Sequence, residues 1–187
     1  MSKNSLSVTQ IPEPFLAKFL FADTRLSFLW LLLRIYIGWQ WVEAGWEKVN
    51  SPMWTGAKAG VALNGFLTGA FAKVGGEHPS VQGWYASFLH TAVQPNIQTF
   101  SYMVAFGELL VGVALILGIF TGIAAFFGAF MNMNYLFAGT ISTNPFMFVI
   151  ELFLILAWRV VGWIGLDRWV LPMLGTPWHK GEVFKKK

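Results

Sequence analysis

The sequence predicts an all-α integral membrane protein, built as a four-transmembrane-helix up-down bundle with an extracytoplasmic cap of amphipathic helices. Two observations predict this class. The 187 residues are 56% hydrophobic and only 12% charged, whereas a soluble domain carries about 25% charged residues. Four apolar runs are also long enough, or nearly so, to cross a hydrocarbon core of about 30 Å as helices.

The first 25 residues are mixed and polar, and we expect them to form a cytoplasmic tail. They lack the short apolar run and small-residue cleavage site of a signal peptide. Leu16, Phe19 and Leu20 are placed either on the membrane surface or in a loosely ordered tail, and the sequence leaves both readings open.

The apolar runs define a membrane domain over residues 26–174, followed by a basic tail over 175–187. The connections at 118–122 and 139–145 are short and contain glycine, so consecutive helices should be antiparallel neighbours. The four predicted spans are residues 26–46, 97–120, 121–138 and 145–164.

Residues 47–96 form the one long connection, and two stretches within it have helical periodicity. Neither stretch is long enough to span, so we expect interfacial helices over one end of the bundle; a soluble cap packed on itself is the alternative. The first stretch repeats apolar residues at Leu63, Phe66, Leu67, Ala70 and Phe71, and the second at Val81, Trp84, Tyr85, Phe88, Leu89, Ala92 and Val93.

Lysines and arginines outside the apolar runs are unevenly divided between the two sides of the predicted bundle. Because cytoplasmic segments are richer in these residues than external ones, we expect both termini in the cytoplasm and the cap outside. The termini share Lys3, Lys18, Arg25, Arg168, Lys180, Lys185, Lys186 and Lys187, whereas the long connection carries only Lys48, Lys58 and Lys73.

Five ionisable residues fall inside the apolar runs: Arg34, Glu43, Glu108, Glu151 and Arg159. A charge at the centre of a spanning helix costs at least about 2.5–3.5 kcal/mol, so these groups need partners or a polar cavity. Arg34 lies about 12 Å into its run and Glu108 about 16 Å into the next. We predict that these two residues pair, and that Asn132, at a similar depth, joins the same cluster.

The helical period supports a shared interior for these groups. Arg34, Gly38, Trp41 and Gly45 follow one stripe, and its small residues permit close helix approach. Glu43 points about 180° away from Arg34. The paired charges are either structural, since polar contacts between helices stabilise bundles, or part of a ligand or redox site in which Glu108 moves a proton.

Several chemistries lack support in the sequence. There is no cysteine, so disulfides, thiol nucleophiles and iron–sulfur clusters held by this chain are excluded. Nucleotide-binding and serine-hydrolase motifs do not occur in a credible context, and nucleic acid is not an expected partner. Glu43 and Glu151 lack the spacing of a metal site, so no metal is predicted.

Three segments resemble the DoxX/DoxD family of small bacterial and archaeal membrane proteins. They are LRIYIG at 33–38 with GWEK at 45–48, GELLVGVALILG at 107–118, and GLDR at 165–168. The resemblance implies a four-helix membrane domain in the cell membrane. It also implies a link to thiosulfate:quinone oxidoreductase, in which a DoxD-like subunit works with a DoxA-like partner to oxidise thiosulfate to tetrathionate and reduce a membrane quinone.

We therefore expect a quinone-linked oxidoreductase subunit in contact with the lipid bilayer, with a DoxA-like partner or a homo-oligomer. A membrane scaffold for soluble redox enzymes and a small proton-coupled transporter using Glu108 and Glu151 are the alternatives. The expected catalytic residues are Glu108 and Arg34; the expected quinone-binding residues are Tyr36, Trp39, Trp41, Asn132, Tyr135, Glu43 and Glu151; Lys48 and His90 are expected to attract an external anion.

Overall fold

The computed structural model describes residues 12–175, and this part of the chain is helical without strands. The predictions for Lys3, Lys180 and the lysines at 185–187 therefore lie outside the described residues. The helices are α1 (Phe15–Ala22), α2 (Ser27–Val49), α3 (Val61–Phe71), α4 (Gly83–Phe88), α5 (Ile97–Leu117), α6 (Thr121–Phe137), α7 (Asn144–Leu156) and α8 (Asp167–Met173), with short helical turns at Thr24–Leu26, Leu89–Val93 and Gln94–Asn96.

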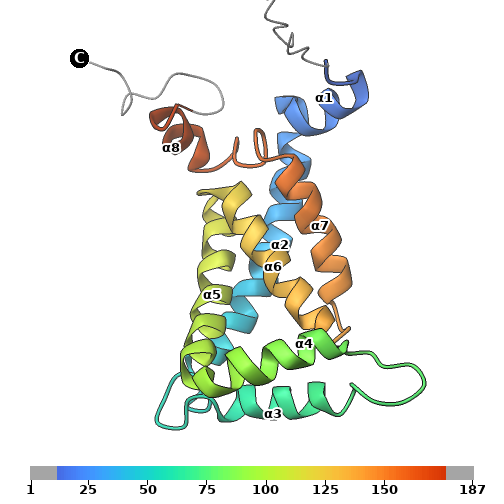
Figure 1. Cartoon of the computed structure of the whole chain (residues 1–187). Coiled ribbons are helices and arrows are strands. Elements are labelled where there is room, and N and C mark those ends of the chain that lie inside the picture. Colours follow the sequence, from blue (N-terminus) through green and yellow to red (C-terminus); the bar gives the residue numbers. More distant parts are fainter. Residues whose placement is uncertain (1–11, 176–187) are drawn as a thin grey trace, which may run out of the picture.

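Helices α2, α5, α6 and α7 pack side by side as a bundle (Figure 1). Their shared core contains Ile37, Trp41, Leu115, Ala125 and Leu154. Most large side chains on the outer faces of these helices are apolar and exposed, which is the surface expected to face lipid. By length and composition, one continuous helical run among residues 12–175, Gly83–Leu117, is apolar enough to cross a membrane, so the arrangement of four spans stays a prediction.

Helices α2 and α5 approach closely because glycine occupies their contact. At Gly45, an added Cβ would lie 2.4 Å from the amide nitrogen of Leu109, and at Gly112 it would lie 2.5 Å from that of Val42. Both separations are too short for any side chain. The small-residue stripe therefore has the role predicted for it, and this contact sets the register between α2 and α5.

The fourth apolar run is helical over a shorter stretch than predicted. Helix α7 ends at Leu156 rather than near residue 164, so it is about 20 Å long. Residues 157–166 instead form turns, and their carbonyl groups at Val161 and Ile164 accept hydrogen bonds from Arg34. The buried Arg34 guanidinium thus binds backbone carbonyl groups that, in a longer α7, would accept hydrogen bonds from amide groups of the same helix.

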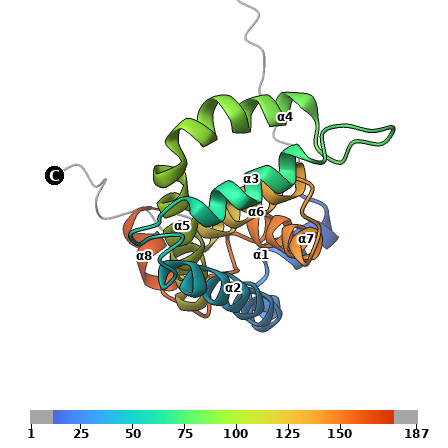
Figure 2. The ribbon, with the colours of Figure 1, turned by 90° about the horizontal axis from the view of Figure 1, so that it is seen from below.

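The predicted amphipathic stretches are helical. Helices α3 and α4 lie across one end of the bundle (Figures 1 and 2), and their apolar stripes meet in a second core. This core includes Leu63, Leu67, Val81, Tyr85 and Leu89. The opposite end carries α1 and α8 (Figure 1). We call these the cap end and the terminus end.

Candidate functional site

Polar side chains are buried at three levels of the bundle. The cap-side cluster contains Lys48, Glu108 and Tyr135. The central cluster contains Trp41, Asn132 and Glu151. The terminus-side cluster contains Arg34, Thr121 and Asp167, together with the backbone groups that they bind.

The cap-side cluster joins α2, α5 and α6. The Lys48 ammonium donates to Glu108 Oε2 at 2.7 Å, and the Tyr135 hydroxyl donates to Glu108 Oε1. The Glu108 side chain is 1% exposed and that of Lys48 is 20% exposed. A buried carboxylate is therefore connected through one lysine to the edge of the cap, where the ammonium also lies 5.3 Å from the Trp54 ring centroid.

The α2–α5 contact explains why Lys48 reaches Glu108. Gly45 lies against the backbone of Leu109, so Lys48, about one turn further along α2, is close to the level of Glu108. The stripe of Arg34, Gly38, Trp41 and Gly45 continues to position 48 with the same helical spacing. The sequence prediction treated Lys48 only as an external anion binder, and extending this stripe by one step would have placed it beside α5.

An apolar pocket of about 450 Å³ lies beside Tyr135, between the cap and helices α5 and α6. Its polar side chains are Tyr85, Asn134 and Tyr135. The Tyr85 hydroxyl bonds to Asn134 Oδ1 at 3.0 Å, whereas the Tyr135 hydroxyl bonds to Glu108. The remaining lining is Leu63, Phe66, Leu67, Phe88, Leu89, Val93, Phe100, Met103, Val104, Gly107, Leu110, Val111, Phe127, Phe130 and Met131.

The central cluster places a second carboxylate in the middle of the bundle. Glu151 Oε1 accepts from Trp41 Nε1 at 2.6 Å and Oε2 accepts from Asn132 Nδ2 at 2.7 Å. All three side chains are buried, and Asn132 Oδ1 has no hydrogen-bond partner among the described residues. Both hydrogen bonds that Glu151 accepts therefore come from neutral side chains rather than from a cation.

The terminus-side cluster binds backbone. Arg34 donates to the carbonyls of Val161 at 3.2 Å and Ile164 at 2.8 Å. Asp167 accepts from the amides of Phe120 at 2.6 Å and Thr121 at 2.9 Å, and from the Thr121 hydroxyl. The Arg34 bonds fasten the segment after α7 to α2, and the Asp167 bonds fasten it to the turn between α5 and α6.

Gly118 gives Arg34 its space in this cluster. Its φ of +68° lies in the left-handed region, which glycine adopts without steric cost. An added Cβ there would lie 2.1 Å from Arg34 Nη1. Sequence reasoning assigned Asp167 no role; its position two residues after Gly165, at the first residue of α8, was the available signal.

The predicted pairing of Arg34 with Glu108 is wrong. Arg34 bonds to carbonyl groups at the terminus end, whereas Glu108 bonds to Lys48 at the cap side. Asn132 joins Glu151 rather than Glu108. The charges are buried as predicted, but depth along each helix did not identify partners, because the partner of Arg34 is backbone from residues beyond α7 and that of Glu108 is a lysine from outside the predicted span.

Three predicted quinone-binding residues lie on the outer face of α2 and away from these clusters. Tyr36 is 41% exposed and Trp39 is 60% exposed, and Glu43 is exposed as well. Their side chains therefore do not line the apolar pocket. Tyr36 instead makes an edge contact with Phe146 of α7.

His90 is exposed at the cap and makes an edge contact with the Phe71 ring. Lys48, its predicted companion, is engaged by Glu108, so the structure does not unite the two as an anion site. Arg159, in the turns after α7, pairs with Glu13. Among residues 12–175, no three His, Asp or Glu side chains gather as a metal-binding group.

Comparison with known proteins agrees with the resemblance of the sequence. Searches of curated proteins and of solved structures returned no significant match. The DoxX family, however, matches residues 29–140, which is more than half of the chain. The match includes the cap-side cluster and the whole apolar pocket, and it stops before Glu151 and Asp167. The chain therefore belongs to the DoxX family of membrane proteins.

Proposed function

We propose that this chain is the quinone-binding subunit of a membrane oxidoreductase, and that quinone occupies the apolar pocket beside Tyr135. One observation carries the proposal: the pocket is lined by Tyr135, whose hydroxyl group is bonded to a buried carboxylate, which in turn is bonded to a partly exposed lysine. Apolar walls, a hydrogen-bond donor and a proton carrier are the three features that a quinone site requires.

The pocket fits a quinone in size and polarity. Its volume of about 450 Å³ lies within the usual range of about 300–1,000 Å³ for small-molecule sites. Aromatic and aliphatic side chains supply flat apolar walls. Tyr135 supplies a hydroxyl group for a quinone carbonyl oxygen. When Glu108 is protonated, Glu108 can donate a hydrogen bond to the Tyr135 oxygen, and the Tyr135 hydroxyl is then able to donate to the quinone.

A bound quinone accepts two electrons and two protons and leaves as quinol. The side chains of this chain provide the proton route. Tyr135 holds a proton at the pocket wall, Glu108 replaces it, and Lys48 links Glu108 to the edge of the cap. Arg34, which we first expected to be catalytic, has no place in this route, because its guanidinium is bonded to backbone at the other end of the bundle.

The resemblance to DoxD-type subunits suggests thiosulfate as the electron donor. Two thiosulfate ions joined by a sulfur–sulfur bond release two electrons as tetrathionate forms, and these electrons with two protons balance the reduction of one quinone. A DoxA-like partner is the proposed source of the remaining thiosulfate chemistry. The sequence has more lysine and arginine in its two terminal segments than in the long connection, which supports an outward-facing cap, where an external oxyanion arrives.

Quinone binding by the purified chain tests the first part of the proposal. Tyr135→Phe is expected to weaken binding of a short-chain ubiquinone about fivefold, the effect of one hydrogen bond. Its control is Tyr36→Phe on the outer face of α2, which should bind like the parent. Gly107→Leu fills the pocket and should abolish binding, whereas Gly65→Leu, where an added Cβ meets nothing within 4 Å, should not.

Turnover tests the proton route. In membranes that supply the partner, Glu108→Gln should lower quinone reduction with thiosulfate about 100-fold, within the range for loss of a general acid, while quinone binding changes little. Unchanged turnover would remove Glu108 from the mechanism. Failure of the parent chain and the Gly65→Leu control to bind quinone would instead favour a scaffold for other redox enzymes.

A further inference from the structure

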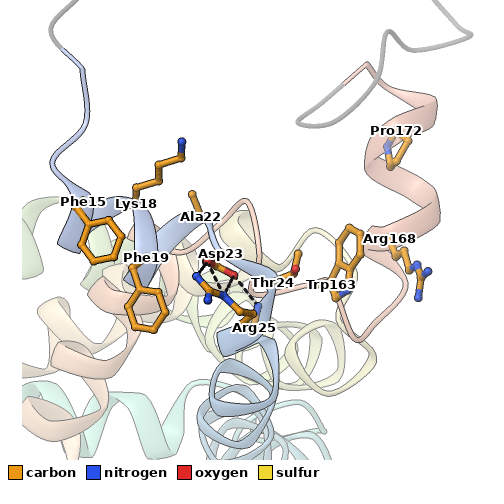
Figure 3. A pocket seen from close by; sticks show the side chains of 10 residues that line it. All are labelled: Phe15, Lys18, Phe19, Ala22, Asp23, Thr24, Arg25, Trp163, Arg168 and Pro172. Atoms are coloured by element: carbon orange, nitrogen blue, oxygen red, sulfur yellow. Dashed lines mark hydrogen bonds and ion pairs between the residues drawn. The ribbon is translucent and has the colours of Figure 1, made fainter.

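A second pocket, of about 820 Å³, lies at the terminus end between α1 and α8 (Figure 3). Lys18, Arg25 and Arg168 line it, together with one acid, Asp23. Three cations and one carboxylate give these lining residues a net charge of +2. The pocket is separate from the proposed quinone site, which lies at the cap side.

The single acid is already neutralised. Arg25 Nε donates to both oxygens of Asp23, and Arg25 Nη2 donates to Oδ2 at 2.6 Å. This interaction holds the Arg25 guanidinium beside α1, where it lies 5.3 Å from the Phe19 ring centroid. Across the pocket, the Arg168 guanidinium lies 5.0 Å from the Trp163 ring centroid. Aromatic rings thus hold one cation on each side (Figure 3).

The position of the pocket indicates the class of anion. It lies where the apolar helices of the bundle end (Figure 1), and the exposed Phe15 lines it. The exposed Trp169 follows Arg168 in α8. Aromatic side chains concentrate at the headgroup level of a bilayer, and the phosphate groups of lipids lie at the same depth. This holds for either leaflet, so it does not depend on which side of the membrane the termini occupy.

We propose that this pocket binds the headgroup of an anionic glycerophospholipid, with Lys18 and Arg25 on one side of the headgroup, Arg168 on the other, and Phe15 and Phe19 against the first acyl carbons. The site selects anionic lipid because a zwitterionic headgroup brings its own cation, which the net positive charge of the pocket repels. The lipid joins α1 to α8 across the end of the bundle.

Native mass spectrometry of the full chain in detergent, titrated with phosphatidylglycerol or with phosphatidylcholine of the same acyl chains, tests this site. Phosphatidylglycerol should bind more tightly to the parent chain. Each cation near an anionic lipid surface strengthens binding about fivefold, so Lys18→Gln/Arg168→Gln should weaken phosphatidylglycerol binding about 25-fold. Arg168→Lys keeps the charge and should retain most of the binding.

The matched control is Lys58→Gln/Lys73→Gln at the cap end, which removes the same charge and should leave lipid binding unchanged. Equal binding of the two lipids, or equal losses in the two double variants, would overturn the proposal. Glycerol 3-phosphate should not displace phosphatidylglycerol at matched concentration. Displacement by it would assign the pocket to a free phosphate compound and would also overturn the lipid proposal.

Discussion

The cap-side and terminus-side clusters both bury charge in the bundle, yet they use it differently. At the terminus side, Arg34 and Asp167 bond mainly to backbone amides and carbonyls. At the cap side, Glu108 bonds only to the side chains of Lys48 and Tyr135 among the described residues, and Tyr135 borders an apolar pocket.

This contrast distinguishes charged groups that hold the fold together from charged groups that are candidates for proton transfer. A charge bonded to backbone fixes the path of the chain, and changing its protonation state releases the segment that it holds. The Glu108 carboxylate is instead bonded to two side chains, one of which lines a cavity, and under the proposed function it exchanges a proton while the helices stay in place. Burial alone, which both clusters share, does not distinguish the two roles.

The largest expected effect is at the terminus-side cluster. Asp167→Ala leaves the amides of Phe120 and Thr121 and the Thr121 hydroxyl without their acceptor. Each unsatisfied buried group costs about 1–3 kcal/mol, so the variant should lose about 3–5 kcal/mol of unfolding free energy. Denaturant unfolding in detergent measures the loss. Glu77→Ala on the exposed cap loop is the control, and a similar loss there would contradict the structural role of Asp167.

The next effect tests the helix contact that positions the cap-side cluster. Gly45→Ala forces a Cβ against the Leu109 backbone, and overpacking of this kind costs about 1–3 kcal/mol. Gly65→Ala, in open space on α3, should instead stabilise slightly, because alanine is a better helix former by about 1 kcal/mol. Opposite shifts in melting temperature are therefore expected, and shifts of the same sign would show that α2 and α5 do not meet at Gly45.

A smaller effect on stability is expected at the cap side. Glu108→Gln keeps an oxygen for Tyr135 or Lys48 and should change the unfolding free energy by about 1–2 kcal/mol, clearly less than Asp167→Ala. Turnover should nevertheless fall strongly, as described above. The comparison between the clusters would fail if Glu108→Gln unfolded the protein as readily as Asp167→Ala.

The smallest expected effect belongs to an exposed pair outside both clusters. Hydrogen bonds from Arg25 hold the pKa of Asp23 below its ordinary value. Because the folded pKa is lowered, the contribution of Asp23 is present above the unfolded pKa of about 3.9 and is lost as pH falls through the folded value. The melting-temperature gap between the parent and Asp23→Asn should be small at neutral pH and close in acid; a gap that widens in acid would contradict this sign.

The order and approximate bounds of α2, α3, α4, α5 and α6 were predictable from the sequence because they depend on local periodicity and on glycine-containing turns, whereas α1 and α8 were not predicted. The apolar stripes at Leu63 and Tyr85 and the small-residue stripe through Gly45 each lie on one helix, so their spacing alone showed which face is buried. The early end of α7 was not predictable in this way. The carbonyl groups of Val161 and Ile164, which follow α7, accept hydrogen bonds from Arg34, and Arg34 lies far away in the sequence.

Only the tertiary structure decided which buried charges meet. The sequence by itself determined that Arg34, Glu108 and Glu151 lie within apolar helices and therefore need polar partners. Which partners they find depends on the register between α2 and α5 and on the backbone that returns after α7. These are set by contacts between distant segments, and a shift of one helical turn, about 5.4 Å, is enough to exchange one partner for another.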